Sequence, residues 1–366
     1  MPGSNVEPSN LASSSDRLMF LDSLRALAIA MVVWLHVSEL YNPNSTIANV
    51  GAFWGRGVQL FFIVSAFTLL TVEHDVKYWR FLGRRFFRIF PMLYIGIVFY
   101  TIRNGMGASM YSPHGVTPID VILNFAFLNA WFPNAAYSVM PGGWSISCEA
   151  MFYLAFPILM MKVRSVRESS IFLLFTIVGS LITMGLILKL GARGDPTIRS
   201  YSYLNPIGQA PAFAFGFLVY FVFHSVRNRK ISHLISPIVV LSSLMTLVVL
   251  SGIGGPLARF HMIADGVLAI LTLSVALSPP RWLVNPWTAY VGRISYSVYV
   301  IHFGVIGVIG RLFKDSVAAA PIAYLAIFAI SIALSGLSYR FIERPMIRFG
   351  RSLIAPERPK LSLPAS

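Results

Sequence analysis

The chain has 366 residues, of which 56% are hydrophobic and only 12% are charged. A soluble domain carries about 25% charged residues, so this sequence cannot supply the polar shell of a water-soluble protein. The formal net charge is +15. Because the basic residues stand between apolar blocks, they indicate membrane topology and contact with anionic lipid headgroups. Membrane lipids are therefore an expected partner and nucleic acid is not.

Apolar blocks near 20 residues long predict an all-α polytopic membrane protein with about ten transmembrane helices, because this length spans about 30 Å of hydrocarbon. A further apolar stretch, Ile119–Trp131, is too short to span comfortably and is expected to be re-entrant or interfacial. In chain order the predicted spans are Leu21–Leu40, Gly57–Val72, Phe86–Ile102, Trp144–Met161, Ile171–Leu190, Pro206–His224, Ile235–Gly252, Phe260–Ser278, Tyr296–Gly310 and Ala320–Phe341.

The basic residues between the spans predict the topology. If the N-terminus is cytoplasmic and Ile119–Trp131 does not cross, the cytoplasmic segments hold 18 lysines and arginines and the opposite segments hold 8. This bias favours two cytoplasmic termini. We expect a disordered tail at 1–18, a transmembrane domain at 19–345 and a second tail at 346–366. Residues 1–20 contain no apolar signal-peptide core, so the first apolar block is expected to act as an uncleaved anchor.

The first predicted span contains a cation and an imidazole on one face. Arg25 and His36 are eleven residues apart, which is about three helical turns and roughly 16 Å along the axis. The pair is typical of an anion anchor with a general base. The alternative is that Arg25 reaches the headgroups and His36 bonds a neighbouring helix. Glu39, three residues beyond His36, is a candidate to orient the imidazole.

A second basic pair begins the third span. Arg85 and Arg88 have i, i+3 spacing and therefore share one helix face. Paired guanidinium groups suit phosphates because each forms bidentate hydrogen bonds. The alternative is ordinary anchoring by positive residues at the cytoplasmic boundary.

The fourth span starts at a turn with two glycines and contains a carboxylate. Gly142 and Gly143 allow a tight turn before Trp144, an interfacial aromatic residue. Glu149 then lies about 8 Å inside the far boundary, the same depth as His36, so the two could share a site in the outer half of the bilayer. A carboxylate beside an imidazole would orient it. The alternative is that Glu149 is a structural partner for another polar group.

Later segments add weaker candidates. Tyr296 and His302 lie on one predicted helix and could line the site, although a lone histidine in a membrane helix is more often packed and hydrogen-bonded. Glu343 and Arg344 are expected to be structural. Cys148 is the only cysteine, which excludes an intrachain disulfide and a cysteine metal cluster, and no metal site is predicted.

Together these patterns resemble the membrane-bound acyltransferase-3 family over nearly the whole chain, from about Leu21 to Pro345. The family's pattern of an Arg and a His separated by ten residues is present, as is its Arg-x-x-Arg element. Two positions differ, since Gln59 replaces a usual acidic residue and Ala66 a usual glycine. The remaining matches are Gly57–Phe67, Gly142–Glu149 with Trp144 and Ser147, the Ile-Ser-Tyr-Ser pattern at 294–297 and the Ile-Glu-Arg-Pro pattern at 342–345.

The resemblance implies an O-acyltransferase of the O-antigen or exopolysaccharide type in the bacterial inner membrane. Such proteins take an acyl group, usually acetyl, from cytoplasmic acyl-CoA and place it on a carbohydrate. It implies that Arg25, Arg85 and Arg88 bind the donor and that His36, oriented by Glu149 or Glu39, activates the acceptor hydroxyl. Some members carry an esterase-like domain that this sequence does not contain, so a partner protein that completes the transfer is also an expectation. The competing interpretation is a polytopic transporter or flippase.

Overall fold

The computed structural model describes residues 14–41, 51, 54–73, 77–109, 112–191, 195–228, 235–252, 261–313 and 317–354, which contain helices and no strand. This confirms the all-α prediction, and each predicted span coincides with a helix. The ten helices are α1 (Ser14–Ser38), α3 (Gly57–Val72), α4 (Tyr78–Asn104), α7 (Gly143–Lys162), α8 (Val166–Leu190), α10 (Pro206–Val226), α11 (Ile235–Gly252), α13 (His261–Leu277), α15 (Ser295–Ile309) and α16 (Ala320–Ser338).

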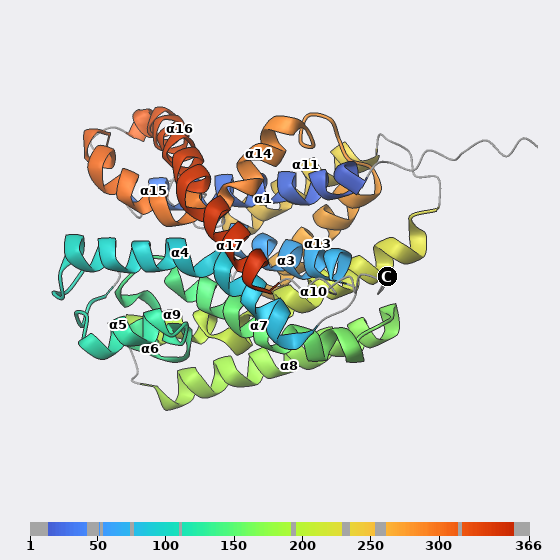
Figure 1. Ribbon diagram of the computed structural model, residues 1–366, viewed down its shortest axis with the longest axis horizontal. Coiled ribbons are helices and arrows are strands. Elements are labelled where there is room, and N and C mark those ends of the chain that lie inside the picture. The colour runs from blue at the N-terminus through green and yellow to red at the C-terminus, as the bar shows by residue number, and fades with distance from the viewer. Residues whose placement is uncertain are drawn as a thin grey trace, which may run out of the picture.

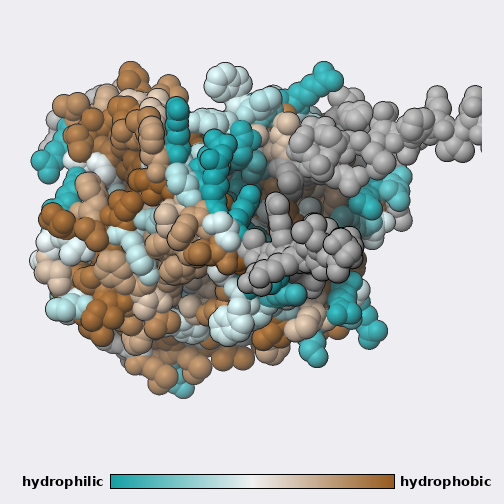
Figure 2. All heavy atoms as spheres, in the orientation of Figure 1, coloured by the Kyte–Doolittle hydropathy of each residue, from teal (hydrophilic) through white to brown (hydrophobic). Residues whose placement is uncertain are grey.

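The helices have the length and surface of a polytopic membrane protein. Within the described ranges, seven are long and apolar enough to cross a membrane by length and composition, and Gly57–Val72, Ile235–Leu250 and His261–Leu277 are shorter apolar helices. Large apolar side chains point outward, as at Phe175 and Ile102, which are 78% and 79% exposed. Figure 2 shows broad hydrophobic regions on the surface of the bundle. A lipid solvent accounts for this exposure because hydrocarbon does not drive such side chains inward.

The segment that was predicted not to span folds into short helices. The helix α5 (Pro118–Phe125) is about 12 Å long at 1.5 Å per residue, which is less than half of a bilayer core. Phe127 then adopts a left-handed conformation with φ 59°, and the chain continues through η1 (Asn129–Trp131) and α6 (Pro133–Ser138). Figure 1 places α5, α6 and α9 (Pro196–Leu204) together at one end of the bundle.

The two ends of the described chain differ from the predicted tails. The first helix begins at Ser14, and α17 (Arg344–Ile354) extends through the start of the predicted second tail. A π-helical turn, η4 (Tyr339–Glu343), connects α16 to α17. The rest of both tails, at 1–13 and 355–366, lies outside the described residues, as does Phe260 at the start of one predicted span.

Helix α1 lies inside the bundle and packs against α3, α15, α16 and α14 (Pro286–Arg293). Its apolar side chains face protein on several sides, and Leu24, Ala28, Ile29 and Val33 are completely buried. The closest approach is at Gly292 of α14, where an added Cβ would lie 1.7 Å from the carbonyl oxygen of Asp22. This burial places the ionisable residues of α1 among other helices rather than in lipid.

The substitution Gly292→Ala should destabilise the protein, because the methyl group would overlap the backbone of α1 and force the two helices apart. We expect a loss of roughly 1–3 kcal/mol, measured as a lower unfolding midpoint of the purified protein in detergent. Gly185→Ala is the matched control, since its Cβ would meet nothing within 4 Å, and it should leave the midpoint unchanged or raise it. Equal midpoints for the two variants would contradict the close α1–α14 contact.

Candidate functional site

The imidazole of His36 is held at the end of α1. Its Nδ1 bonds Glu39 Oε2 at 2.9 Å, and its ring centroid lies 4.3 Å from that of Phe303 and 5.4 Å from that of His302. Glu39 follows His36 by one helical turn, so local helix geometry brings the two side chains together. Because the carboxylate takes Nδ1, Nε2 is the ring nitrogen left for a ligand.

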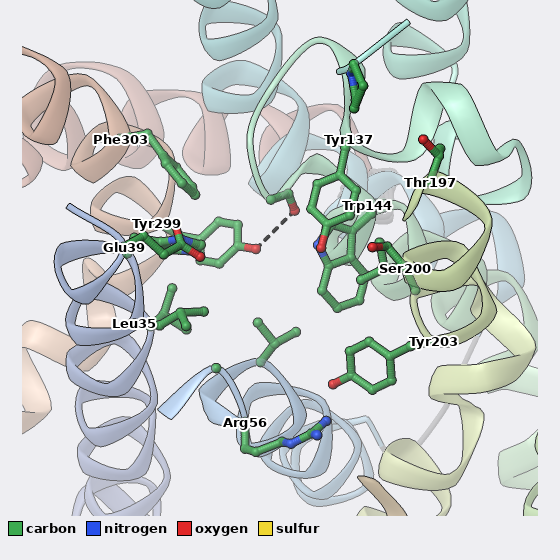
Figure 3. Close-up of a pocket in the computed structure, with 17 residues that line it drawn as sticks. Leu35, Glu39, Arg56, Tyr137, Trp144, Thr197, Ser200, Tyr203, Tyr299 and Phe303 are labelled. Atoms are coloured by element: carbon green, nitrogen blue, oxygen red, sulfur yellow. Dashed lines mark hydrogen bonds and ion pairs between the residues drawn. The ribbon is translucent and has the colours of Figure 1, made fainter. Parts of the chain in front are cut away.

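His36 lines a cavity of about 370 Å³, which we call the His36 cavity. Figure 3 shows Tyr299 and Tyr203 approaching it from opposite sides, with Tyr137 and Trp144 between them and Arg56 below. The helices that supply these rings are far apart in the sequence. An aromatic wall with a few polar groups suits a ligand that offers flat apolar faces and hydroxyl groups.

The glycine turn before α7 fixes one wall of this cavity. Gly142 has φ 78°, and an added Cβ would lie 2.6 Å from the hydroxyl oxygen of Tyr299. The Tyr299 hydroxyl donates to the Gly142 carbonyl at 3.0 Å and lies 2.8 Å from Ser145 Oγ. The second glycine, Gly143, is also crowded, since its Cβ would lie 3.2 Å from Asn124 Oδ1. The turn therefore joins α7 to α15.

The opposite wall comes from α9. Asp195 caps α9 by accepting a hydrogen bond from the backbone N–H of Thr197 at 2.8 Å, and this bond lowers the pKa of the Asp195 carboxyl. Gln59 donates to the Tyr203 hydroxyl and, at 2.7 Å, to Gln209 Oε1. Gln59 thus positions Tyr203 through a buried amide network.

The carboxylate of Glu149 lies in a neighbouring cavity of about 70 Å³, the central cavity. It accepts hydrogen bonds from Ser65 Oγ at 2.5 Å and from the Tyr153 hydroxyl at 2.6 Å. The depth argument placed Glu149 beside His36, but in the structure the carboxylate bonded to His36 is that of Glu39. Equal depth fixes a layer of the bundle and not the direction in which a helix face points, which is why the predicted pairing was wrong.

The predicted cations Arg25, Arg85 and Arg88 do come together. All three line the central cavity and a third, larger space of about 850 Å³, the arginine cavity. Arg25 bonds Asp22 at 2.8 Å and Thr68 Oγ1 at 2.7 Å. Arg85 bonds Glu73 at 2.5 Å. The spacing predicted one face for Arg85 and Arg88, the family resemblance added Arg25, and all three line the same cavity.

The three cavities form a row through the bundle. The His36 and central cavities share Val58 and Tyr299, and the central and arginine cavities share Arg25, Thr68, Arg85 and Arg88. Along α1 the row extends from Arg25 to His36, about 16 Å. A thin ligand held by arginines at one end could therefore reach the imidazole at the other.

The other candidate residues predicted from the sequence lie in different parts of the bundle. Tyr296 lines the central cavity and donates to the Ile89 carbonyl at 2.7 Å. Ser147 is buried and donates to Asn129 Oδ1. His302 lies behind His36, with Nδ1 3.0 Å from the Val298 carbonyl oxygen and Nε2 without a hydrogen-bond partner among the described residues.

Several lining residues were not predicted from the sequence. Tyr153 could have been found, because it stands four residues after Glu149 and therefore shares its helix face. Ser65 and Thr68 share a face of α3 in the same way, but nothing in an apolar helix singles out two hydroxyls. Arg56 and Tyr203 meet only through the tertiary fold, where the guanidinium lies 5.0 Å from the ring centroid.

The fold and the site define a polytopic helical membrane protein with an ionisable passage inside its bundle. The acyltransferase-3 family, described as an acyltransferase domain, matches residues 19–340. The chain belongs to this family, as its motifs predicted. No solved structure matches the chain.

Curated relatives are similar over most of the chain. A Staphylococcus aureus (strain COL) protein provisionally named an O-acetyltransferase is 24% identical over 90% of this chain, and the peptidoglycan O-acetyltransferase OatA of Listeria monocytogenes is 22% identical over 90%. The chain spans only 57% and 56% of these two relatives. The acyltransferase MdmB of Streptomyces mycarofaciens is 23% identical over 95% of both chains.

The contact between Ser145 and Tyr299 should be measurable as an interaction energy. A double-mutant cycle with Ser145→Ala and Tyr299→Phe should give a coupling of about 1 kcal/mol in unfolding free energy, because the two hydroxyls bond each other at 2.8 Å. Tyr299→Phe with Ser180→Ala is the control pair, since Ser180 bonds Gly208 instead, and it should be additive. Additivity in both cycles would show that the α7–α15 link is not formed.

Proposed function

We propose that this protein is a membrane-embedded O-acyltransferase that moves a small acyl group, such as acetyl, from acyl-CoA to a hydroxyl of a carbohydrate. The observation that carries the proposal is the row of cavities, with the arginines at one end and an oriented imidazole at the other. Membership of the acyltransferase-3 family supports the reaction class. The acceptor is a surface polysaccharide or its precursor, a class supported by the peptidoglycan substrate in the name of the Listeria relative.

The passage fits the shape and charge of the donor. The phosphates of acyl-CoA bind in the arginine cavity, where Arg25, Arg85 and Arg88 supply bidentate donors. The pantetheine arm is about as long as five extended residues, roughly 16 Å. This equals the separation of Arg25 and His36 along α1, so an arm in the central cavity brings the thioester to the imidazole. The small central cavity favours small acyl groups.

The chemistry at the far end is acyl transfer with general-base catalysis. His36 Nε2 takes the proton of the acceptor hydroxyl, and Glu39 stabilises the imidazolium through Nδ1. The acceptor oxygen attacks the thioester carbonyl, the C–S bond breaks, and the departing thiolate receives the proton from the imidazolium. General-base assistance of this kind contributes about 10²–10⁴-fold to a rate. A transient acyl-imidazole is the alternative course.

The topology follows from the charge bias of the sequence. The protein lies in a bacterial inner membrane with both termini and the arginine cavity on the cytoplasmic side, and acyl-CoA is made in the cytoplasm. The His36 cavity opens towards the opposite side. The Staphylococcus and Listeria relatives are nearly twice the length that this chain spans. The proposal also includes a partner protein that completes the transfer outside the membrane.

Replacing His36 by Ala should abolish transfer, because no other group takes the proton, while Glu39→Gln should lower kcat about 10–100-fold. The assay follows acceptor-dependent CoA release with a thiol reagent, using purified protein in detergent and soluble peptidoglycan fragments as acceptor. Cys148 is buried and should not interfere. His114→Ala, at an exposed position, is the control. Full activity in His36→Ala would remove the mechanism, and solute uptake by vesicles without any acyl transfer would favour a transporter.

The double variant Arg85→Gln, Arg88→Gln should mainly weaken donor binding. Each lost charged hydrogen bond costs about 1.5–3 kcal/mol, so the KM for acetyl-CoA should rise at least tenfold with a smaller change in kcat. Arg84 would still pair with Glu73 at 2.6 Å, which keeps that carboxylate satisfied. Arg164→Gln, at an exposed loop position, is the control. An unchanged KM in the double variant would make the two arginines topological anchors only.

A further inference from the structure

A second set of arginines faces the arginine cavity from α17. Arg344, Arg348 and Arg351 have i, i+4, i+7 spacing and lie on one face of this helix, and all three line the cavity. From the sequence Arg344 was expected to be structural, and Arg348 and Arg351 counted only among the basic residues of the cytoplasmic side. Figure 1 shows α17 crossing the bundle beside α4, and Figure 2 shows hydrophilic side chains gathered in that region between hydrophobic ones.

The apolar side of α17 fixes this orientation. Phe349 contacts Phe87 of α4 edge to face, with ring centroids 5.7 Å apart. Gly350 lies so close to the same ring that an added Cβ would be 2.5 Å from it, and a Cβ on Gly83 would be 2.6 Å from Ile354. Because α17 is docked on α4 along this side, its basic face is directed into the cavity opposite the arginines of α4.

The cavity carries an excess of positive charge. Its lining includes eight arginines and only three acidic residues, Asp22, Glu73 and Glu343. Asp22 pairs with Arg25, and Glu73 pairs with Arg84 and Arg85. Arg344, Arg348 and Arg351 form no ion pair with any residue in the described ranges. Guanidinium groups gathered without counter-charges repel one another, so the cavity is suited to a ligand with several negative charges.

The order of the arginines along the passage separates two sets. Arg25, Arg85 and Arg88 line both the arginine cavity and the central cavity, so they stand where the passage narrows. The arginines of α17 line the arginine cavity alone and are further from the narrow part. A donor that enters with its thioester first therefore leaves its diphosphate at the first set and its nucleotide end at the second.

We propose that Arg344, Arg348 and Arg351 form a phosphomonoester site that binds the 3′-phosphate of the donor nucleotide. The inference rests on the proposed function, since it assigns one end of the same donor. A phosphomonoester dianion suits several arginines because it offers three oxygens and close to two negative charges. An anionic lipid headgroup offers related chemistry to a basic amphipathic helix, so the experiment must separate the two sources.

The experiment compares coenzyme A with 3′-dephospho-coenzyme A, which keeps the diphosphate and lacks only the 3′-phosphate. Affinities are measured by calorimetry with the full chain in nanodiscs of phosphatidylcholine alone. The wild-type protein should bind coenzyme A more tightly. In Arg348→Gln, Arg351→Gln the affinity for coenzyme A should fall at least tenfold while that for the dephospho compound stays nearly constant, so the preference disappears. Retained binding of the dephospho compound shows that the variant is folded.

Arg340→Gln is the matched control, because Arg340 is exposed just before α17 and does not line the cavity. It should keep the preference for coenzyme A. A preference that survives in the α17 variant overturns the assignment, and a defect that appears only in nanodiscs containing phosphatidylglycerol reassigns the arginines to lipid. If the wild-type protein binds both compounds equally, the 3′-phosphate site is wrong and the proposed donor stands. If it binds neither compound, the proposed function fails as well.

Discussion

Charged and titratable groups are costly in hydrocarbon, and this cost governs how the bundle is arranged around α1. Among the described residues α1 contacts α3, α13, α14, α15 and α16, so that Arg25 near its middle and His36 near its end lie in protein-lined spaces. A carboxylate lies one helical turn from each of these two residues. Asp22 bonds Arg25 within α1, and Glu39, just after the end of α1, bonds His36. These local pairs satisfy part of the hydrogen-bonding capacity of each group, and Arg25 also bonds Thr68 of α3 at 2.7 Å.

Two glycines mark where neighbouring segments of the bundle come closest. Because Gly292 has no side chain, the backbone of α1 can approach α14 closely. In the same way, Gly142 leaves room for the hydroxyl of Tyr299 beside the turn before α7. In both places a side chain would fill the space that a backbone or hydroxyl group occupies. The polar interior is thus assembled by a few close approaches, while the lipid-facing surface needs only apolar character. This division is typical of membrane bundles, in which small residues set helix contacts.

The sequence predicted the architecture well because hydrocarbon imposes a length on each span. The ranges of the ten helices and the non-spanning segment around Ile119–Trp131 followed from apolar block lengths alone. Spacing along one helix also succeeded, as with Arg85 and Arg88, because the 3.6-residue period fixes which side chains share a face. The contacts between side chains of different helices were not predicted correctly. Glu149 was predicted to have the depth of His36, but its bonds are to Ser65 and Tyr153.

The remaining features depend on tertiary contacts that no single-helix rule contains. Tyr203 reaches the His36 cavity because α9 is capped at Asp195. Gln59 donates to its hydroxyl, and Gln209 donates to its backbone carbonyl at 2.6 Å. The role of α17 depends on its docking against Phe87. Both require knowledge of which helices are neighbours.

The narrow middle of the passage has a consequence for the energetics of the cell. A continuous wet path between the two sides of an energised membrane would discharge its ion gradients. The central cavity is small, and Phe61, Tyr296 and Tyr299 line it together with the arginines and Glu149. A small pore diameter limits the passage of hydrated ions. The arginines at the wider end add an electrostatic barrier to protons and metal cations. In the proposed mechanism the same few side chains admit the uncharged arm of the donor and preserve electrical insulation.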